Sequence, residues 1–239
     1  MWGLADTGLN QRGNLATPGS YCPHCGSALK IRHLVPLLSY LFQRGRCANC
    51  NEPISVRYPL VELTGAATAL IAIISHGLTI EAALLAVFLW TLIPLAVIDL
   101  ETGYLPDMLT LPLIALGIGF NITGKFVPFK DALIGAAIGY LAFRLIGEAF
   151  IRLRNKEGLG QGDAKLLSAI GAWAGWMVLA PTVFLAALST LLIIGLLMVC
   201  GRTIGPDTEI PFGPALALGG AVLVILTSNG FTLERLAGL

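Results

Sequence analysis

The fold is decided by a stretch in the middle of the chain, residues 86–120, AVFLWTLIPLAVIDLETGYLPDMLTLPLIALGIGF. Two apolar runs flank a short polar segment, which carries three acids, Asp99, Glu101 and Asp107. Apolar runs of about 20 residues cross the hydrocarbon core of a bilayer as α-helices. The stretch therefore predicts a helical membrane protein with carboxyl groups where the chain turns back at the membrane surface.

The composition of the whole chain supports this prediction. Of 239 residues, 56% are hydrophobic and 12% are charged, and the mean hydropathy is +0.80. Soluble domains carry about 25% charged residues, so these values exclude a disordered chain, a collagen, a coiled coil and almost any soluble enzyme. We expect membrane lipid around most of the chain and no nucleic-acid partner.

Several apolar segments are long enough, or nearly so, to cross a membrane. They lie at 59–76, 82–98, 105–122, 131–150, 164–178, 179–200 and 211–228. Two are marginal, because 105–122 contains Pro106 and Pro112, and because 164–178 is only about 15 residues long. The predicted fold class is all-α, a polytopic membrane protein with about seven transmembrane helices and a small cytoplasmic zinc-binding lobe.

The chain divides into three predicted parts. Residues 1–20 are polar, lack the apolar core of a signal peptide and are predicted to be a flexible N-terminal lead-in. Residues 21–58, the cysteine lobe, are predicted to form the cytoplasmic zinc-binding part. Residues 59–239 are predicted to form a transmembrane helical domain.

The distribution of Lys and Arg indicates the orientation of the chain. If the cysteine lobe faces the cytoplasm and all seven segments cross, nine of these residues from Lys30 onward lie on the cytoplasmic side and three lie outside. Cytoplasmic loops of membrane proteins carry an excess of Lys and Arg. We therefore predict seven crossings, with the N-terminal side inside and the C-terminus outside.

The cysteine lobe carries Cys22, Cys25, Cys47 and Cys50 in a C-x2-C-x21-C-x2-C layout. Two such pairs favour a tetrahedral metal site, and the predicted metal is Zn²⁺. The alternatives are two disulfides or free thiols, which a reducing cytoplasm disfavours. Since so small a lobe cannot bury a sufficient core, the predicted role of the zinc is structural. The fifth cysteine, Cys200, is interpreted as an inert, packed thiol.

The segment between the two cysteine pairs, VPLLSYLFQRGR at 35–46, is apolar and then basic. One interpretation is an amphipathic element that lies on the membrane surface with its arginines at the lipid headgroups. The other is a hydrophobic core for the cysteine lobe. The two interpretations are compatible.

Acids near the membrane are functional candidates, because a carboxylate is costly in hydrocarbon. Asp99 ends a segment that runs inward, and Asp163, after Gly160 and Gly162, begins a segment that runs outward, so both reach the cytoplasmic face. Two close carboxyl groups share one proton. One can then take a proton from water while the other polarises a carbonyl, as in aspartic proteases.

Structural roles for these acids remain open at this point. Asp107 can cap a helix beginning near Met108. Asp99 and Asp163 can each cap a helix or pair with Lys165 or Arg154. Two further acids stand in apolar runs and could mark a proton path, Glu62 and Glu148, although Arg144 can pair with Glu148 at i,i+4.

Several stretches together resemble the type IV prepilin peptidases, or leader peptidases, which serve type IV pili and type II secretion. They are CPHCG (22–26), CANC (47–50), RYPLVELTG (57–65), DLETGYLPDMLTLP (99–112), KEGLGQGDAKLLSAIGAWAGW (156–176) and PFGPALALGG (211–220), in the order of the family. The GxGD motif alone is weak, but the whole set is specific.

The resemblance implies a membrane aspartyl endopeptidase with Asp99 and Asp163 as its catalytic pair and Asp107 as an accompanying, non-essential acid. It implies that the supporting loop contains Gly160, Gly162 and Lys165. The implied substrates are prepilins or pseudopilins, whose basic leader is removed at the cytoplasmic face of the bacterial inner membrane. Many members then methylate the new N-terminus with S-adenosylmethionine, an activity associated with the zinc-binding lobe.

One departure from the family pattern concerns the start of the chain. Members normally begin with another transmembrane helix before the cysteine lobe, and residues 1–20 contain no such segment. No Gly-rich dinucleotide-type fingerprint indicates a cofactor site. Two other classes of function stay open from the residues alone: an ion- or proton-coupled transporter, and a non-enzymatic membrane scaffold whose zinc lobe docks a secretion partner.

Overall fold

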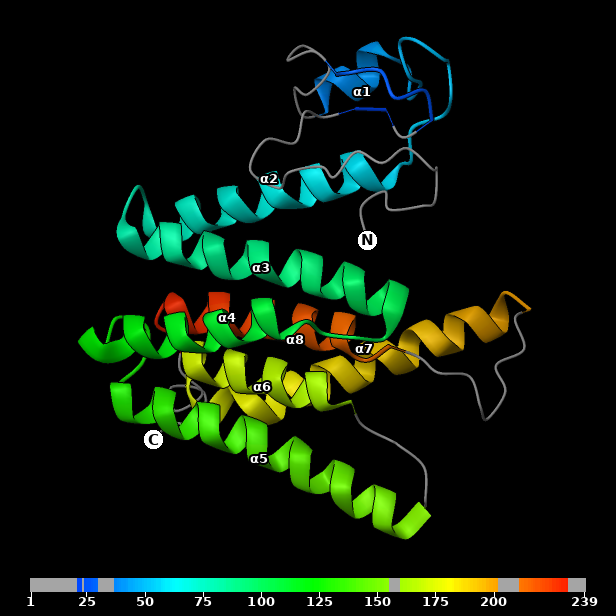
Figure 1. Cartoon of the computed structure of the whole chain (residues 1–239). Helices are drawn as coiled ribbons and strands as arrows, with labels where there is room; N and C mark the ends of the chain where they lie inside the picture. The colour runs from blue at the N-terminus through cyan, green and yellow to red at the C-terminus, as the bar shows by residue number, and fades with distance from the viewer. Residues whose placement is uncertain (1–20, 23, 30–36, 155–159, 202–210, 232–239) are drawn as a thin grey trace. The chain divides into compact units, whose positions relative to one another are not determined.

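The computed structural model describes residues 21–22, 24–29, 37–154, 160–201 and 211–231 (Figure 1). These residues form helices and no strand, so the all-α fold class is confirmed. The chain separates into two compact units, Met1–Ala67 and Thr68–Leu239. The predicted lead-in, residues 1–20, lies outside the described residues.

The helices follow the predicted apolar segments closely. They are α1 Leu38–Phe42, α2 Arg57–His76, α3 Ile80–Thr102, α4 Asp107–Phe120, α5 Phe129–Arg154, α6 Gln161–Ala174, α7 Leu179–Val199 and α8 Gly213–Ser228, with short 3₁₀ helices η2 Asn121–Thr123 and η3 Trp176–Val178. Each of the seven predicted segments holds one of the helices α2 to α8.

Four helical stretches of the described chain are long and apolar enough to cross a membrane: Arg57–His76, Ile80–Thr102, Phe129–Leu153 and Trp176–Val199. Helices α4, α6 and α8 are shorter. A helix of 14 residues, such as α6, spans about 21 Å, less than the hydrocarbon thickness of about 30 Å. The protein is therefore multi-pass, and the count of seven crossings stays a prediction.

Local sequence signals set the ends of α3 and the start of α4. Thr79 caps α3, because its side chain accepts a hydrogen bond from the backbone N–H of Ala82 at 3.3 Å. Gly103 ends the helix with φ at 63°, a left-handed conformation that favours glycine. Pro106 then adopts extended backbone, and α4 begins at Asp107. The polar segment between the helices is thus only a few residues long.

Helix α6 forms the centre of the second unit and packs against α4, α5 and α8. From Asp163 to Ala174, every residue except Lys165 is buried. Its polar side chains are bonded internally: Ser168 Oγ donates to the Ala136 carbonyl at 2.8 Å, and Trp173 Nε1 donates to the Leu113 carbonyl at 2.9 Å. A short helix can be buried this completely because neighbouring helices satisfy its polar groups.

The buried Asn121 fastens the far end of α6. Its Nδ2 donates to the carbonyls of Ala172 at 3.0 Å and Trp173 at 3.3 Å. Its Oδ1 accepts from the backbone N–H groups of Phe126 at 3.1 Å and Val127 at 3.2 Å. One side chain therefore ties η2, the start of the α5 connection and the last turn of α6 together.

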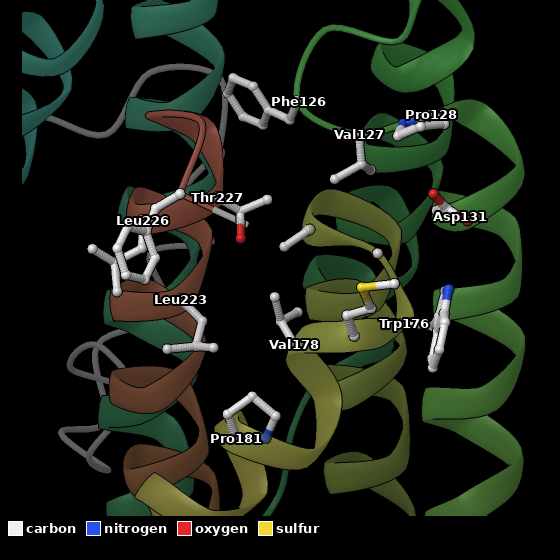
Figure 2. A pocket seen from close by; sticks show the side chains of 14 residues that line it. Phe126, Val127, Pro128, Asp131, Trp176, Val178, Pro181, Leu223, Leu226 and Thr227 are labelled. Carbon is white, nitrogen blue, oxygen red and sulfur yellow. The ribbon is translucent and has the colours of Figure 1, made fainter. Parts of the chain in front are cut away.

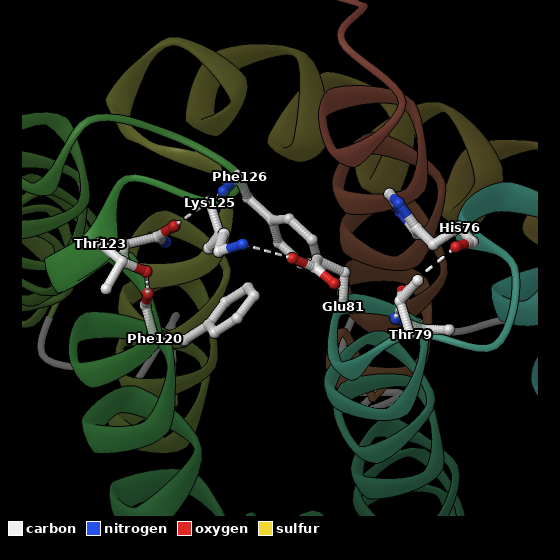
Figure 3. A network of polar contacts seen from close by, with 9 residues as sticks. His76, Thr79, Glu81, Phe120, Thr123, Lys125 and Phe126 are labelled. Atoms are coloured by element: carbon white, nitrogen blue, oxygen red, sulfur yellow. Dashed lines mark hydrogen bonds and ion pairs between the residues drawn. The ribbon is translucent and has the colours of Figure 1, made fainter.

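A polar network lies at the same end of the bundle (Figure 3). Lys125 Nζ donates to Glu81 Oε1 at 2.7 Å, which joins the loop before α5 to the first turn of α3. Thr79 Oγ1 donates to the His76 carbonyl at 3.1 Å and closes the turn between α2 and α3. These contacts fix the end of the bundle at which α3 begins, opposite the end at which Asp99 lies.

The close packing of α5 on α6 generates a first prediction. A Cβ atom at the buried Gly139 would lie 2.7 Å from the Leu167 carbonyl oxygen, whereas one at the exposed Gly195 meets nothing within 4 Å. Gly139→Leu should lower the free energy of unfolding by about 1–3 kcal/mol or more, because the backbone of α6 cannot yield. Thermal unfolding of the purified protein in detergent measures this loss.

Gly195→Leu in α7 is the matched control for Gly139→Leu, and it should leave the melting temperature close to that of the parent protein. Equal destabilisation by the two substitutions would contradict the packing described here.

Candidate active site and metal centre

Two carboxyl groups meet at the end of the bundle where α3 ends and α6 begins. Asp99 lies in the last turn of α3 and is 6% exposed, and Asp163 lies in the first turn of α6 and is 8% exposed. The two groups are close enough to interact electrostatically. The structure thus brings together the two acids that the sequence singled out, from helices more than 60 residues apart in the chain.

A backbone amide holds one of these acids. Gly213, the first residue of α8, donates its N–H to Asp99 Oδ2 at 3.0 Å. A Cβ atom at Gly213 would lie 2.5 Å from the same oxygen, so a glycine is required where the backbone approaches the carboxyl group. Gly213 was not predicted to have this role, although it lies in the stretch PFGPALALGG at 211–220.

The predicted glycine loop is shorter than expected. Gly160 lies outside α6 with extended backbone, and a Cβ atom there would lie 3.3 Å from Asp163 Oδ2. Gly162, however, belongs to the first turn of α6, and a Cβ atom there would lie 2.7 Å from Leu105 Cβ. The expected supporting loop of Gly160, Gly162 and Lys165 therefore does not extend to Gly162, whose small size instead lets Leu105, just before α4, pack on α6.

Asp107 and Lys165 form an ion pair between the starts of α4 and α6. The expectation that Asp107 caps α4 is wrong: the cap position is Pro106, and no side chain accepts a capping hydrogen bond there. A lysine ammonium on the facing helix is a stronger partner for the carboxylate than backbone N–H groups. The predicted pairing of Lys165 with Asp99 or Asp163 gives way to this contact.

The other acids in apolar segments have structural partners. Arg144 Nε lies 2.9 Å from Glu148 Oε1, as the i,i+4 spacing predicted, and Arg152 Nη2 lies 4.0 Å from the other oxygen of Glu148. Glu62 Oε2 accepts a hydrogen bond from the backbone N–H of Leu37 at 2.8 Å. These contacts favour structural roles for Glu62 and Glu148 over a proton path.

A cavity of about 340 Å³ (Figure 2) lies at the opposite end of the bundle from Asp99 and Asp163. It is enclosed by the start of α5, the end of α6, the start of α7 and the end of α8. Its lining is mainly apolar, with Trp176 and Leu223 among its residues and the polar side chains of Asp131 and Thr227 beside them. None of the predicted site residues lines it.

The four predicted metal ligands of the cysteine lobe converge. The sulfur atoms of Cys22, Cys25, Cys47 and Cys50 all lie within 4.8 Å of one another, and the Cys22 and Cys50 sulfurs are 3.9 Å apart. Four sulfurs at about 2.3 Å from a tetrahedral Zn²⁺ are separated by about 3.8 Å. The cluster could therefore hold one metal ion, whereas Cys200 is exposed rather than packed as predicted.

The two cysteine pairs are built on one repeated backbone pattern, which we call the first and second knuckle, residues 21–28 and 46–53. In each knuckle the first cysteine donates its N–H to the carbonyl of the residue five positions later, at 3.0 Å in the first knuckle and 2.9 Å in the second. The carbonyl of the same cysteine accepts from the N–H of the residue four positions later, at 2.9 Å in the first knuckle and 3.0 Å in the second. Each also closes with an isolated bridge between its first and last residues. Gly26 and Asn51, which follow the second cysteine, both have positive φ.

The knuckle backbone also favours the metal-binding form of a thiol. Backbone N–H groups of Cys50 and Asn49 face the Cys47 sulfur and lower the pKa of this thiol to about 6. The thiolate is the form that ligates metal. The donor set and its spacing therefore suit a metal ion.

Comparisons with known proteins agree with these features. The type IV leader peptidase family matches residues 86–196, and the bacterial peptidase A24 N-terminal domain matches residues 7–76. A protein of Burkholderia pseudomallei (strain K96243) named prepilin leader peptidase/N-methyltransferase is 46% identical over 218 residues, which cover 91% of this chain and 70% of that protein. The chain belongs to the type IV leader peptidase family.

Other relatives in this family carry the same name. That of Aeromonas hydrophila is 45% identical over 215 residues, covering 89% of this chain and 73% of that protein. That of Pectobacterium carotovorum subsp. carotovorum is 43% identical over 235 residues, covering 97% of this chain and 81% of that protein. No solved structure shows a significant match.

The cysteine cluster generates a second prediction for this family member. Protein purified without chelator should contain about one metal ion per chain, and the double substitution of Cys22→Ser and Cys25→Ser should remove it, because two of four ligands are lost. Elemental analysis by mass spectrometry measures the content.

The exposed Cys200 provides the control, since Cys200→Ser should leave the metal content unchanged. Metal-free parent protein would contradict the assignment of the four ligands.

Proposed function

We propose that this protein is a membrane aspartyl endopeptidase that removes the basic leader peptide from prepilins or pseudopilins at the cytoplasmic face of the bacterial inner membrane. The observation that carries the proposal is the meeting of Asp99 and Asp163 at one end of the bundle. Its context is a chain 46% identical to a prepilin leader peptidase/N-methyltransferase. Neither of the other two classes, transporter or scaffold, has support in these relatives.

The proposed chemistry is hydrolysis with a shared proton. In a dyad of this kind one carboxylate takes a proton from a water molecule, and the resulting hydroxide adds to the scissile carbonyl carbon. The protonated partner donates a hydrogen bond to the carbonyl oxygen. A proton then passes to the leaving nitrogen, the C–N bond breaks, and water has been added across the peptide bond.

Gly213 is proposed to position Asp99 in this reaction. Its N–H stands at the start of α8, where the helix dipole places partial positive charge, and it occupies one oxygen of Asp99. The other oxygen of Asp99 is then available toward Asp163. We assign Gly213 a positioning role because it contacts a proposed catalytic group rather than the substrate.

The substrate class follows from charge and hydropathy. A prepilin presents a cationic leader and then an apolar helix. Glu101 in the last turn of α3, Tyr104 on the connection and Asp107 at the start of α4 are each partly or fully exposed, and the two carboxylates give this end of the bundle negative charge toward a basic leader. The apolar helix of the substrate can remain in the lipid alongside the bundle.

The second half of the relatives' name supports a proposed N-methyltransferase activity on the newly exposed N-terminus. S-adenosylmethionine is the proposed methyl donor. The hydrolysis proposed above uses the two carboxyl groups and water alone, so the two activities can be separated by mutation.

The proposed metal is Zn²⁺, held by Cys22, Cys25, Cys47 and Cys50 in the cytoplasm. Four thiolates select zinc among the common divalent ions, and a closed four-ligand site leaves no position for catalysis. The zinc would then stabilise the fold of the lobe. We also propose the three-part organisation of the chain, 1–20, 21–58 and 59–239.

The dyad generates a third prediction. Asp99→Asn and Asp163→Asn should each lower cleavage of a purified prepilin by about 10²–10⁴-fold or more, because neither acid can replace the other in proton transfer. Asp107→Asn is the matched control: it also removes a carboxylate at this end of the bundle, yet most activity should remain. Leader removal resolved on gels gives the rates. A fully active Asp99 or Asp163 variant would contradict the proposed mechanism.

The contact between Gly213 and Asp99 generates a fourth prediction. Gly213→Ala should displace the Asp99 carboxyl group and lower kcat by about 10²-fold, as for a misplacement of about 1 Å. Binding of the substrate should change little, so KM should stay near the parent value. Gly119→Ala in α4, where an added Cβ meets nothing within 4 Å, should be active. Unchanged kcat in the Gly213 variant would refute the positioning role.

A further inference from the structure

The cysteine lobe exposes two large apolar side chains on one short helix. Leu41 is 69% exposed and Phe42 is 85% exposed, both at the end of α1. The prediction that the segment 35–46 supplies a core for the lobe therefore does not apply to these two residues. Side chains of this size at adjacent positions mark a surface that contacts another apolar phase or partner.

Hydrogen bonds hold this exposed helix in place. Tyr40 Oη donates to the Ile54 carbonyl at 3.5 Å. The backbone carbonyl of Tyr40 accepts from the Gly45 N–H at 2.9 Å. Ile54 N–H in turn donates to the Gly45 carbonyl at 2.7 Å. Because α1 is bonded to Gly45 and Ile54, the two residues that flank the second knuckle, Leu41 and Phe42 are presented by a fixed element.

The depth of α1 relative to the bilayer follows from its contact with α2. The Leu37 N–H, directly before α1, donates to Glu62 Oε2 at 2.8 Å. Glu62 lies five residues after Arg57, the first residue of a helix able to cross a membrane, which is about 7.5 Å along the helix axis. The headgroup layer is about 5–8 Å thick on each side. With Arg57 at the outer edge of this layer, Glu62 and the start of α1 come to the boundary between headgroups and acyl chains.

The charges around α1 match a lipid surface. Arg44 and Arg46 follow α1 and are both exposed, and the exposed Arg57 and Tyr58 begin α2. Basic residues and tyrosines concentrate at the headgroups of membranes, and arginines are attracted to anionic lipids. The single acid of residues 37–58 is Glu52, which lies 3.7 Å from His24 on the first knuckle.

From these observations we propose that the cysteine lobe docks on the membrane through α1. Leu41 and Phe42 enter the acyl-chain boundary of the leaflet in which α2 begins, and Arg44 and Arg46 bind anionic phosphates of its headgroups. The metal-bound knuckles form the rigid frame that presents α1. This role is independent of the peptidase chemistry and depends only on α2 entering the membrane at Arg57.

Fluorescence quenching of the full-length protein in vesicles tests the proposal. Phe42→Trp adds one tryptophan to the four of the chain, and the emission added relative to the parent protein reports its surroundings. In vesicles of phosphatidylcholine and phosphatidylglycerol, bromine atoms on the acyl chains should remove most of this added emission. Aqueous iodide should remove little of it. Leu41→Trp, at the preceding position of the helix, should independently give the same result.

His24→Trp is the matched control in the same lobe, since this side chain is 66% exposed and lies beside an acid. Its added emission should be quenched by iodide rather than by bromine. Adding Arg44→Glu and Arg46→Glu to Phe42→Trp should shift quenching from bromine toward iodide, with the metal content unchanged. Quenching at residue 42 by iodide alone would overturn the proposal. Quenching by neither agent would overturn it too, because protein would then cover α1.

Discussion

The structure depends on the cost of keeping two carboxyl groups side by side in an apolar bundle. Asp99 and Asp163 are almost fully buried, so hydrogen bonds and shared protons must replace the water that each has lost. Backbone groups next to the helix starts supply such hydrogen bonds, from Gly213 to Asp99 and from Gly160 to Asp163. The ends of α3, α6 and α8 are therefore fixed by electrostatics as much as by packing.

In the second unit, helix α6 provides the buried surroundings of Asp163. This helix, whose first turn carries Asp163, is surrounded by α4, α5 and α8. Such close surroundings require small residues, and the backbone of α5 approaches α6 at Gly135 and Gly139. The opposite end is fastened by Asn121, so α6 cannot slide along its neighbours without breaking buried hydrogen bonds.

The apolar runs, with the Gly, Pro and charged residues that separate them, were sufficient to predict the helices. The spacing of the four cysteines was sufficient to predict their cluster. The convergence of Asp99 and Asp163 followed from counting crossings. Gly213 and the Asp107–Lys165 pair were not predicted in these roles, because each joins helices distant in sequence. A glycine that admits a carboxyl group looks the same in sequence as one that admits a neighbouring helix, and only the fold distinguishes them.

The repeated knuckles have a consequence for how this lobe can change over evolutionary time. Each knuckle completes its own hydrogen bonds and its own bridge, so neither depends on the length of the chain that joins them. Doubling a flexible loop costs only about 0.6 kcal/mol in closure entropy. The insert between Ala28 and Arg46, which carries α1, can therefore be lengthened, shortened or exchanged while the four cysteines keep their positions relative to one another. The lobe in this sense consists of two self-contained knuckles joined by an exchangeable insert.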